Sequence, residues 1–213
     1  GETEVRGKHY HYQTSYVPDV RPDGVQQGFF SFTYDITQLK QAEQALEALA
    51  RQDVLTGLAN RRSFDERLAA ALARSARQRQ PLALLTMDID HFKGINDGLG
   101  HAAGDEVLQE FGRRLAACVR AGDLVARVGG DEFAVLVEGV GSLDSATGFA
   151  DKLLERMRDP ITVEGAARQV GTSIGIAYSH GRADAKALML AADQALYDAK
   201  AAGRGNWKLR EIG

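Results

Sequence analysis

The first 36 residues alternate between polar positions and apolar or aromatic positions, a period of two that is typical of β-strands. Residues 8–17 and 27–34 are rich in tyrosine, phenylalanine, threonine and valine, which favour strands. Residues 18–24 contain two prolines, two aspartates and a glycine, which is the chemistry of a turn. The pattern predicts a two-stranded hairpin. Because such a hairpin is marginally stable alone, we expect it to close a domain whose first part lies upstream.

The hydrophobic period changes after residue 37. Leu39, Ala42, Leu46 and Leu49 are spaced 3, 4 and 3 residues apart, as on the apolar seam of a coiled coil. The spacing predicts a helix over residues 38–52. Two heptads leave two interpretations open: a dimerising linker, or an amphipathic helix packed on its own domain.

From residue 53 to the end, helical and strand patterns alternate, which predicts an α+β fold with a mixed sheet flanked by helices. The segment 82–87 is almost wholly apolar, as expected of a strand covered on both faces. The expected helices span 63–78, 104–119, 143–158 and 185–201. The expected strands span 82–87, 124–127, 132–137, 172–178 and 207–209, with a small hairpin formed by 161–163 and 168–170.

Composition is that of a globular protein: 44% of the 213 residues are hydrophobic and 26% are charged. The length allows one large domain, or one domain plus a fragment. A net charge of −3 argues against a chain that coats a nucleic-acid polymer, and no apolar run reaches the roughly 20 residues of a membrane helix. The single cysteine, Cys118, excludes an internal disulfide and indicates a reducing compartment. We therefore expect a cytoplasmic location, with a membrane anchor upstream left open.

Glycine and acidic residues gather in the middle of the chain, where eight of the 23 glycines lie between Gly94 and Gly130. Asp88 follows the apolar strand, and Asp131 follows two glycines at a turn between strands. If those strands are neighbours, the two carboxylates converge, and two carboxylates with nucleotide phosphates commonly hold Mg²⁺. Taken alone, Asp131 is a good turn residue and Asp88 a solvated strand end.

Five segments, in order, resemble the GGDEF family, the diguanylate cyclases of bacteria: residues 53–62, 88–97, 100–105, 127–133 and 199–206. Five motifs in register are a strong signal. The resemblance implies an adenylyl-cyclase or ferredoxin-like sheet. It also implies condensation of two GTP into cyclic di-GMP with release of pyrophosphate. An antiparallel pair of domains would each bring one GTP, and the 3′-hydroxyl of one would attack the α-phosphorus of the other in line.

The resemblance also implies a metal site and a catalytic set. Mg²⁺ or Mn²⁺ would be held by the side chains of Asp88 and Asp131 and by the carbonyl of Ile89. Asp131 matches the family's proposed proton acceptor and Glu132 a required acidic position. Lys93 would stabilise charge in the transition state.

Five further positions match residues that contact GTP in the family: Asn96, His101, Asp105, Lys200 and Arg204. Asp105 suits guanine, because a carboxylate accepts hydrogen bonds from both the N1–H and the 2-amino group, which adenine lacks. Lys200 and Arg204 match a pair that binds phosphate.

One more match to the family concerns regulation of the enzyme by its product. Arg120 and Asp123 match the family's RxxD inhibitory site, where the product binds and holds the domains in a non-productive arrangement. An arginine fork suits phosphates and guanine edges.

The N-terminal segment, residues 1–37, resembles the closing strands of a PAS sensor domain, which is typically followed by a signalling helix. The predicted organisation is therefore a PAS fragment over 1–37, a linker helix over 38–52 that would form a homodimer, and a GGDEF domain over 53–213. Two other functions remain open: a catalytically silent module that binds GTP or cyclic di-GMP, and a different nucleotide cyclase that uses ATP or a mixed pair of nucleotides. The complete motif at residues 129–133 favours an active enzyme, and Asn96 and Asp105 favour guanine.

Overall fold

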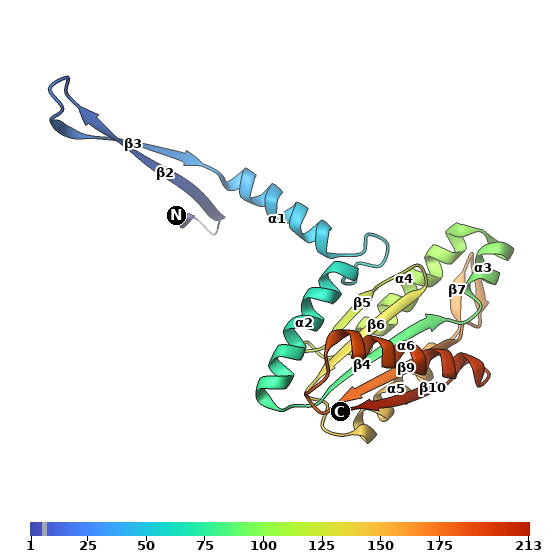
Figure 1. Cartoon of the computed structure of the whole chain (residues 1–213). Coiled ribbons are helices and arrows are strands. Elements are labelled where there is room, and N and C mark those ends of the chain that lie inside the picture. Colours follow the sequence, from blue (N-terminus) through green and yellow to red (C-terminus); the bar gives the residue numbers. More distant parts are fainter. Residues whose placement is uncertain (6–7) are drawn as a thin grey trace. The chain divides into compact units, whose positions relative to one another are not determined.

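The computed structural model describes residues 1–5 and 8–213, with their side chains apart from those of 2–5, 8–9, 44–45 and 47–49. The chain divides into two compact units, Gly1–Ala50 and Arg51–Gly213, which are described separately (Figure 1).

The first unit contains a sheet of three antiparallel strands, ordered β1 (Glu2–Val5), β2 (Lys8–Val20) and β3 (Gln26–Asp35). The predicted hairpin corresponds to β2 and β3, whose connecting turn is closed by the N–H of Gly24 donating to the carbonyl of Arg21 at 2.8 Å. The sequence pattern missed β1, because four residues that include two glutamates give too short and too polar a signal.

Helix α1 (Thr37–Arg51) follows β3, as the spacing predicted. Its start is fixed by the N–H of Thr37, which donates to Asp35 Oδ1 at 2.9 Å, and by the Thr37 hydroxyl oxygen, which accepts from the N–H of His11 at 2.9 Å. On the predicted seam Leu39 and Leu46 are 64% and 67% exposed. The side chain of Leu49 lies outside the described residues. The seam's role as a dimerising linker stays a prediction.

The second unit is built on a five-stranded mixed sheet with the order β10-β9-β4-β6-β5, which confirms the predicted fold class. β10 pairs with β9 in parallel and the other neighbours are antiparallel. The strands are β4 (Leu82–Ile89), β5 (Leu124–Arg127), β6 (Glu132–Glu138), β9 (Thr172–Ser179) and β10 (Trp207–Ile212).

Helices cover both faces of this sheet (Figure 1). The helices α4 (His101–Cys118) and α5 (Leu143–Met157) bury the larger core with Leu85, Met87 and Phe133, whereas α2 (Arg61–Gln78) and α6 (Ala185–Ala201) bury a second core with Leu84 and Leu136. Because side chains alternate along a strand, β4 and β6 each contribute to both cores.

Helix α6 lies unusually close to β9, because Gly175 has no side chain. A Cβ atom there would overlap the carbonyl oxygen of Ala192 and the backbone nitrogen of Leu196. Since Lys200 is in the last turn of α6, this close packing also fixes where Lys200 lies relative to the sheet.

Two details differ from the expectation. A short helix, α3 (Phe92–Leu99), was not predicted, because its eight residues include two glycines and give little helical period. The small hairpin pairs β7 (Ile161–Val163) with β8 (Ala166–Arg168), so its second strand lies two residues earlier than predicted, with Gly165 at a positive φ of 76° in the turn.

Among the described residues, no helix combines the length and the apolar character that a membrane crossing requires.

Candidate functional site

The ends of β4 and β6 bring four predicted site residues together. Asp88 and Glu132 are directly opposed in the antiparallel ladder, and the N–H of Ile89 donates to the carbonyl of Asp131 at 3.4 Å. Because side chains alternate between the two faces along a strand, Asp88 and Glu132 lie on the sheet face that α2 and α6 cover. In each strand, the nearest residue on that face is two positions away. Residues that are more than 40 positions apart in sequence therefore form one cluster.

Lys200 joins this cluster from α6. Its ammonium group lies 2.7 Å from Asp88 Oδ2, and the two side chains are 31% and 17% exposed. Burial raises the pKa of the Asp88 carboxyl, and the negative charge of Asp131 raises it further, whereas Lys200 opposes both effects. The balance is a pKa above the ordinary value, with burial as the main cause and the charge of Asp131 as a smaller one.

The turn from Val128 to Glu132 is tightly closed. The N–H of Val128 donates to the carbonyl of Glu132 at 2.9 Å. A Cβ atom at Gly129 would overlap Glu132 Oε2, whereas one at Gly130 would meet nothing within 4 Å. The first glycine is therefore needed so that the Glu132 side chain can lie back over the turn, while the second is exposed.

Arg127 holds this turn from outside. Its guanidinium donates to the carbonyl of Gly130 at 3.0 and 2.8 Å and to both carboxylate oxygens of Asp53 at 3.0 and 3.2 Å. Asp53 Oδ1 also accepts from the N–H and the hydroxyl of Thr56, at 2.9 and 2.7 Å. Burial raises the pKa of the Asp53 carboxyl, but these hydrogen bonds outweigh burial and hold that pKa below its ordinary value.

Asn96 is set between α3 and α4 by another close approach. A Cβ atom at Gly104 would overlap Asn96 Oδ1, so the absence of a side chain there makes room for the Asn96 amide. Asn96 is half-buried, whereas His101, Asp105 and Lys93 are exposed on the same two helices. These residues form a polar edge beside the helix pair.

Arg204 lies in the loop of residues 202–206, which follows α6. Gly203, Arg204 and Gly205 all have positive φ angles, of 107°, 63° and 59°. For arginine this conformation costs roughly 1–2 kcal/mol. The Asn206 side chain stabilises the loop by donating to the carbonyls of Ala199 at 3.0 Å and Arg204 at 2.9 Å.

Comparison with known proteins now decides the family. The family model described as "Diguanylate cyclase, GGDEF domain" matches residues 50–206. The chain belongs to the GGDEF family. The expectation drawn from the five motifs is confirmed, and the second unit is referred to below as the GGDEF domain; nothing in the comparisons bears on the PAS interpretation of residues 1–37.

Similar proteins include diguanylate cyclase TpbB of Pseudomonas aeruginosa, 42% identical over 82% of this chain and 41% of TpbB. An uncharacterized signaling protein of Caulobacter vibrioides is also 42% identical, over 82% of this chain and 22% of that protein. The chain thus spans less than half the length of these relatives. Among solved structures, the GGDEF domain of TpbB has a TM-score of 0.71 at 44% identity, covering 74% of this chain and 93% of that one. The coiled coil and GGDEF domain of DgcB from Caulobacter crescentus, in complex with c-di-GMP, has a TM-score of 0.76 at 26% identity, covering 83% of this chain and 93% of that one.

The RxxD residues of the GGDEF domain, Arg120 and Asp123, lie away from the cluster of Asp88, Asp131, Glu132 and Lys200. They precede β5, whose first residue pairs with Leu136 near the far end of β6, whereas the turn of Gly129 and Gly130 joins the opposite ends of these strands. Arg120 Nε donates to Asp123 Oδ1 at 3.2 Å and its Nη2 to the carbonyl of Glu138 at 2.6 Å. The motif therefore lies near the opposite end of β6 from the acidic turn.

The donor set fits a hard divalent cation. Two carboxylates, of Asp88 and Asp131, repel each other at adjacent strand ends, and a lysine ammonium already lies on one of them. Within the residues that the structure describes, no group of three or more His, Cys, Asp or Glu side chains is placed to hold a metal ion by itself. Oxygen donors from the nucleotide phosphates would therefore have to complete the coordination.

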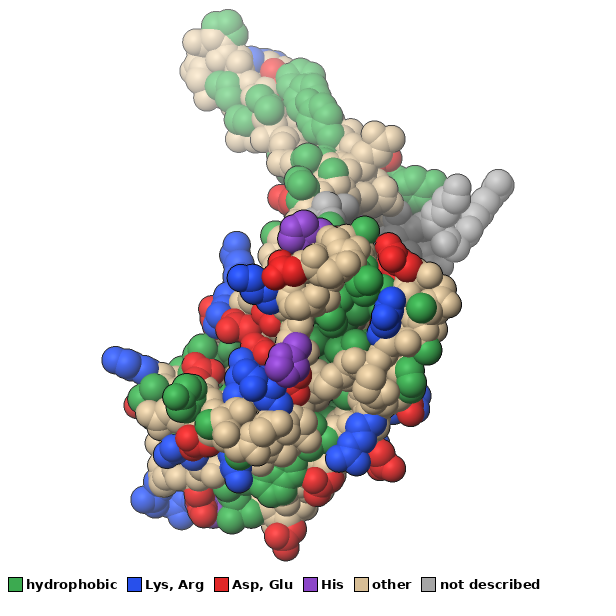
Figure 2. Space-filling model, turned by 90° about the vertical axis from the view of Figure 1, so that its right-hand side faces the viewer, with side chains coloured by type: hydrophobic (Ala, Val, Ile, Leu, Met, Phe, Trp, Pro, Cys, Tyr) green, Lys and Arg blue, Asp and Glu red, His purple; other side chains and the backbone are tan. Residues whose placement is uncertain are grey.

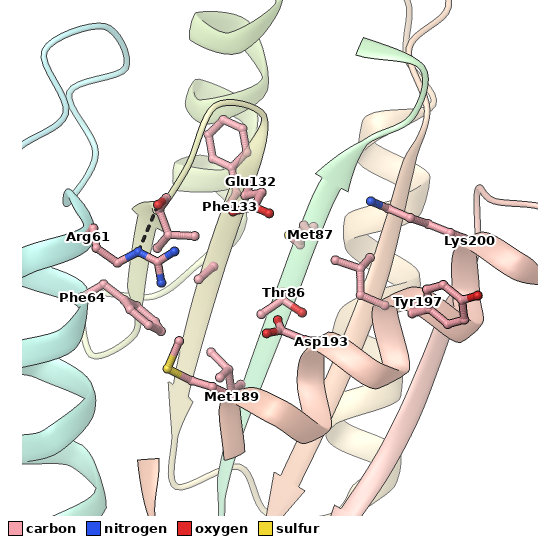
Figure 3. Close-up of a pocket in the computed structure, with 14 residues that line it drawn as sticks. Arg61, Phe64, Thr86, Met87, Glu132, Phe133, Met189, Asp193, Tyr197 and Lys200 are labelled. Atoms are coloured by element: carbon pink, nitrogen blue, oxygen red, sulfur yellow. Dashed lines mark hydrogen bonds between the residues drawn. The ribbon is translucent and has the colours of Figure 1, made fainter. Parts of the chain in front are cut away.

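A cavity of about 340 Å³ adjoins the cluster on the α2 and α6 face of the GGDEF domain (Figure 3). Glu132 and Lys200 lie on its wall, and Arg61 closes one side, with Nε donating to the carbonyl of Val128 at 3.1 Å. Asp193 of α6 also lines the cavity, where burial raises the pKa of its carboxyl. The cavity therefore leaves space beside Glu132 and Lys200 on the α2 and α6 face of the sheet.

Asp90, Arg127 and Asp53 had no assigned role in the site predicted from the sequence. Asp90 is nine-tenths buried, and both of its carboxylate oxygens accept hydrogen bonds. The available signal for Asp90 was its place directly after a buried strand, because a charged residue is rarely buried without a partner. On the face of the GGDEF domain seen in Figure 2, acidic and basic side chains are interspersed.

Proposed function

We propose that the GGDEF domain of this chain is an active diguanylate cyclase, which condenses two GTP into one cyclic di-GMP and two pyrophosphates. The observation that carries the proposal is the closed turn of residues 128–132, with Glu132 directly opposite Asp88 and Lys200 on Asp88. The acidic side chains thus gather at the ends of two neighbouring strands of the sheet. The names of relatives such as TpbB support the same activity.

The chain's own residues divide into a metal-holding set and a substrate-binding set. Asp88, Asp131 and the carbonyl of Ile89 would hold Mg²⁺ or Mn²⁺. The bound cation would neutralise the charge that develops on the phosphates and ease loss of the proton from the 3′-hydroxyl.

Substrate recognition would use both sides of the cluster. Asn96, His101 and Asp105 on α3 and α4 would contact the guanine end of GTP, with Asp105 accepting from N1–H and the 2-amino group. Lys200 and Arg204 would bind the phosphates, because both are cations at the end of α6 and the loop that follows it.

Three residues would act on the reacting atoms. Lys93, exposed in the first turn of α3, would stabilise negative charge on the transferring phosphoryl group. Asp131 would accept the proton of the 3′-hydroxyl. Glu132, held against Gly129, would contribute a second carboxylate at the point where the two nucleotides meet.

The reaction joins two nucleotides, so we propose that two GGDEF domains act as a homodimer with one GTP each. Exposed Leu39 and Leu46 on α1 support this proposal, because apolar side chains at seam spacing are stabilised by a second helix. We also propose that cyclic di-GMP inhibits the enzyme at Arg120 and Asp123.

The experiment is incubation of the purified chain with GTP and Mg²⁺, with the product identified by mass. We expect cyclic di-GMP, and we expect Asp131→Ala to lose turnover while its circular dichroism and melting temperature stay those of the wild type. Asp65→Ala, a change of an exposed aspartate on α2, is the matched control and should retain turnover. Absence of product at every protein concentration would contradict the proposal.

A second candidate is a GGDEF module that binds nucleotide without turnover. The comparisons favour keeping it, because cyclic di-GMP phosphodiesterase NbdA of Pseudomonas aeruginosa is also similar, 36% identical over 80% of this chain. Calorimetry with GTP and with cyclic di-GMP separates the two: the silent module would bind at least one of them and yield no product.

A further inference from the structure

The buried carboxylate of Asp90 accepts two hydrogen bonds, one on each of its oxygens. The hydroxyl of Ser173 donates to Oδ1 at 2.7 Å, and the backbone N–H of Gly205 donates to Oδ2 at 3.1 Å. Asp90 is 9% exposed and Ser173 is fully buried. An acceptor with two oxygens is thus matched to two donors in a site that water hardly reaches.

The two donors belong to different parts of the fold. Ser173 is in β9 and is the ladder partner of Asp88, so one oxygen is anchored to the strand beside the catalytic cluster. Gly205 is in the 202–206 loop, directly after Arg204. No other described residue accepts from the Gly205 N–H, so Asp90 is its structural partner.

The surroundings of Asp90 leave little freedom for another arrangement. Its own N–H donates to the carbonyl of Gly171 at 3.0 Å, and a Cβ atom at Gly171 would come within 3.1 Å of Asp90 Oδ2. The 202–206 loop holds three consecutive residues at positive φ, one of them the non-glycine Arg204. Such a backbone persists only where the surrounding structure determines it.

We propose that Asp90 is a positioning residue: it ties the 202–206 loop to the end of β4, which carries Asp88, and so sets where the Arg204 guanidinium meets the phosphates of a nucleoside triphosphate. The part concerning phosphates rests on the proposed function. The tie itself concerns the loop alone and can be measured without substrate.

The first test is amide hydrogen exchange at Gly205, followed by NMR in the chain without nucleotide. In Asp90→Ala the N–H of Gly205 loses its acceptor, and its exchange should accelerate about tenfold or more. Asp90→Asn should restore most of the protection, because an amide oxygen can accept from Gly205 while its N–H₂ donates to Ser173 Oγ. Asp65→Ala on α2 is the control and should leave Gly205 unchanged. Wild-type exchange at Gly205 in Asp90→Ala would overturn the proposal.

The second test is kinetic. Asp90→Ala should raise the KM for GTP about tenfold, the lower end of what loss of a supporting partner costs. The effect should shrink in an Arg204→Ala background, because both changes then remove the same contact. The Mg²⁺ concentration for half-maximal rate should not change, which separates positioning of Arg204 from damage to Asp88. Additive effects, or a shifted Mg²⁺ requirement with KM unchanged, would overturn the proposal.

If Asp90→Ala fails to fold, Ser173→Ala supplies the same tests, because it removes one anchor of the carboxylate and keeps the other. It should raise Gly205 exchange and KM in the same direction by a smaller factor, and no change in either would count against the tie. If the wild type makes no cyclic di-GMP, the proposed function fails while the exchange experiment still decides the role of Asp90 in the loop.

Discussion

The Arg127 guanidinium donates to both carboxylate oxygens of Asp53, across 74 positions of sequence. The same guanidinium donates to the carbonyl of Gly130 in the turn that carries Asp131 and Glu132. One side chain therefore joins the segment that leads into the GGDEF domain to its acidic turn. These two parts are far apart in sequence, but in the fold the same arginine forms hydrogen bonds with both.

Asp53→Asn tests this tie through the pH dependence of stability. The pKa of Asp53 lies below its ordinary value in the folded chain, so its stabilising effect is complete above the ordinary pKa and is lost as the pH falls through the lowered one. The wild type should therefore lose more stability than Asp53→Asn between about pH 5 and about pH 2. At neutral pH the variant should be less stable by about 1–3 kcal/mol, the scale of hydrogen bonds to a charged group.

The measurement for Asp53 is urea unfolding at each pH, with the free energy of unfolding compared between the two proteins. Asp65→Asn, a change of an exposed carboxylate, should behave like the wild type. An equal loss of stability on acidification in wild type and Asp53→Asn would show that the tie does not depend on the charge.

Gly104→Ala should weaken GTP binding without unfolding the domain. The new Cβ would overlap Asn96 Oδ1, so the Asn96 amide must move. Loss of one hydrogen bond to the base is about 1.4 kcal/mol, which raises the KM for GTP about tenfold. Gly98→Ala on α3 is the matched control, because a Cβ atom at Gly98 would meet nothing within 4 Å. An unchanged KM in Gly104→Ala would remove Asn96 from the proposed GTP site.

Arg120→Ala should relieve product inhibition and leave the initial rate unchanged. The arginine is exposed and lies near the opposite end of β6 from Glu132, the ladder partner of Asp88, so its loss should not disturb turnover. The cyclic di-GMP concentration that halves the rate should rise about tenfold, equivalent to one charge-assisted hydrogen bond. Arg113→Ala, which breaks another exposed i,i+3 ion pair, is the control. Equal inhibition of Arg120→Ala and wild type would place the inhibitory site elsewhere.

Leu46→Glu should shift the monomer–dimer equilibrium toward monomer. A charge on the predicted seam of α1 must lose its water when two helices meet, whereas Gln41→Glu adds the same charge at an exposed position off the seam. Sedimentation should show weaker association for Leu46→Glu only, and the rate per chain should become more dependent on protein concentration. Identical association of the two variants would exclude the seam as the dimer contact.

Most of the fold follows from local patterns in the sequence. The apolar run before Asp88 predicted a covered central strand, and β4 is that strand. By contrast, α3 was missed because Gly94 and Gly98 conceal its period, and it forms where α4 supplies a surface to pack on. A local pattern cannot report a packing partner.

The site residues also fall into those that a local pattern marks and those that it does not. Asp88 and Asp131 were expected to converge because each follows a recognisable strand or turn, and the ladder opposes Asp88 to Glu132. The contacts of Asp90 with Ser173 and Gly205 span 83 and 115 positions. Such contacts depend on strand order and on how the 202–206 loop returns to the sheet, neither of which has a local signature.

The 202–206 loop has one further consequence. Its left-handed backbone is held by the Asn206 amide and by Asp90. A flexible loop would lose about 1–2 kcal/mol of backbone entropy per residue on becoming ordered around a phosphate group. In this chain that loss accompanies folding, so a phosphate bound by Arg204, as proposed, would meet a preorganised loop. Its affinity would then depend on the fixed backbone of the loop as much as on charge.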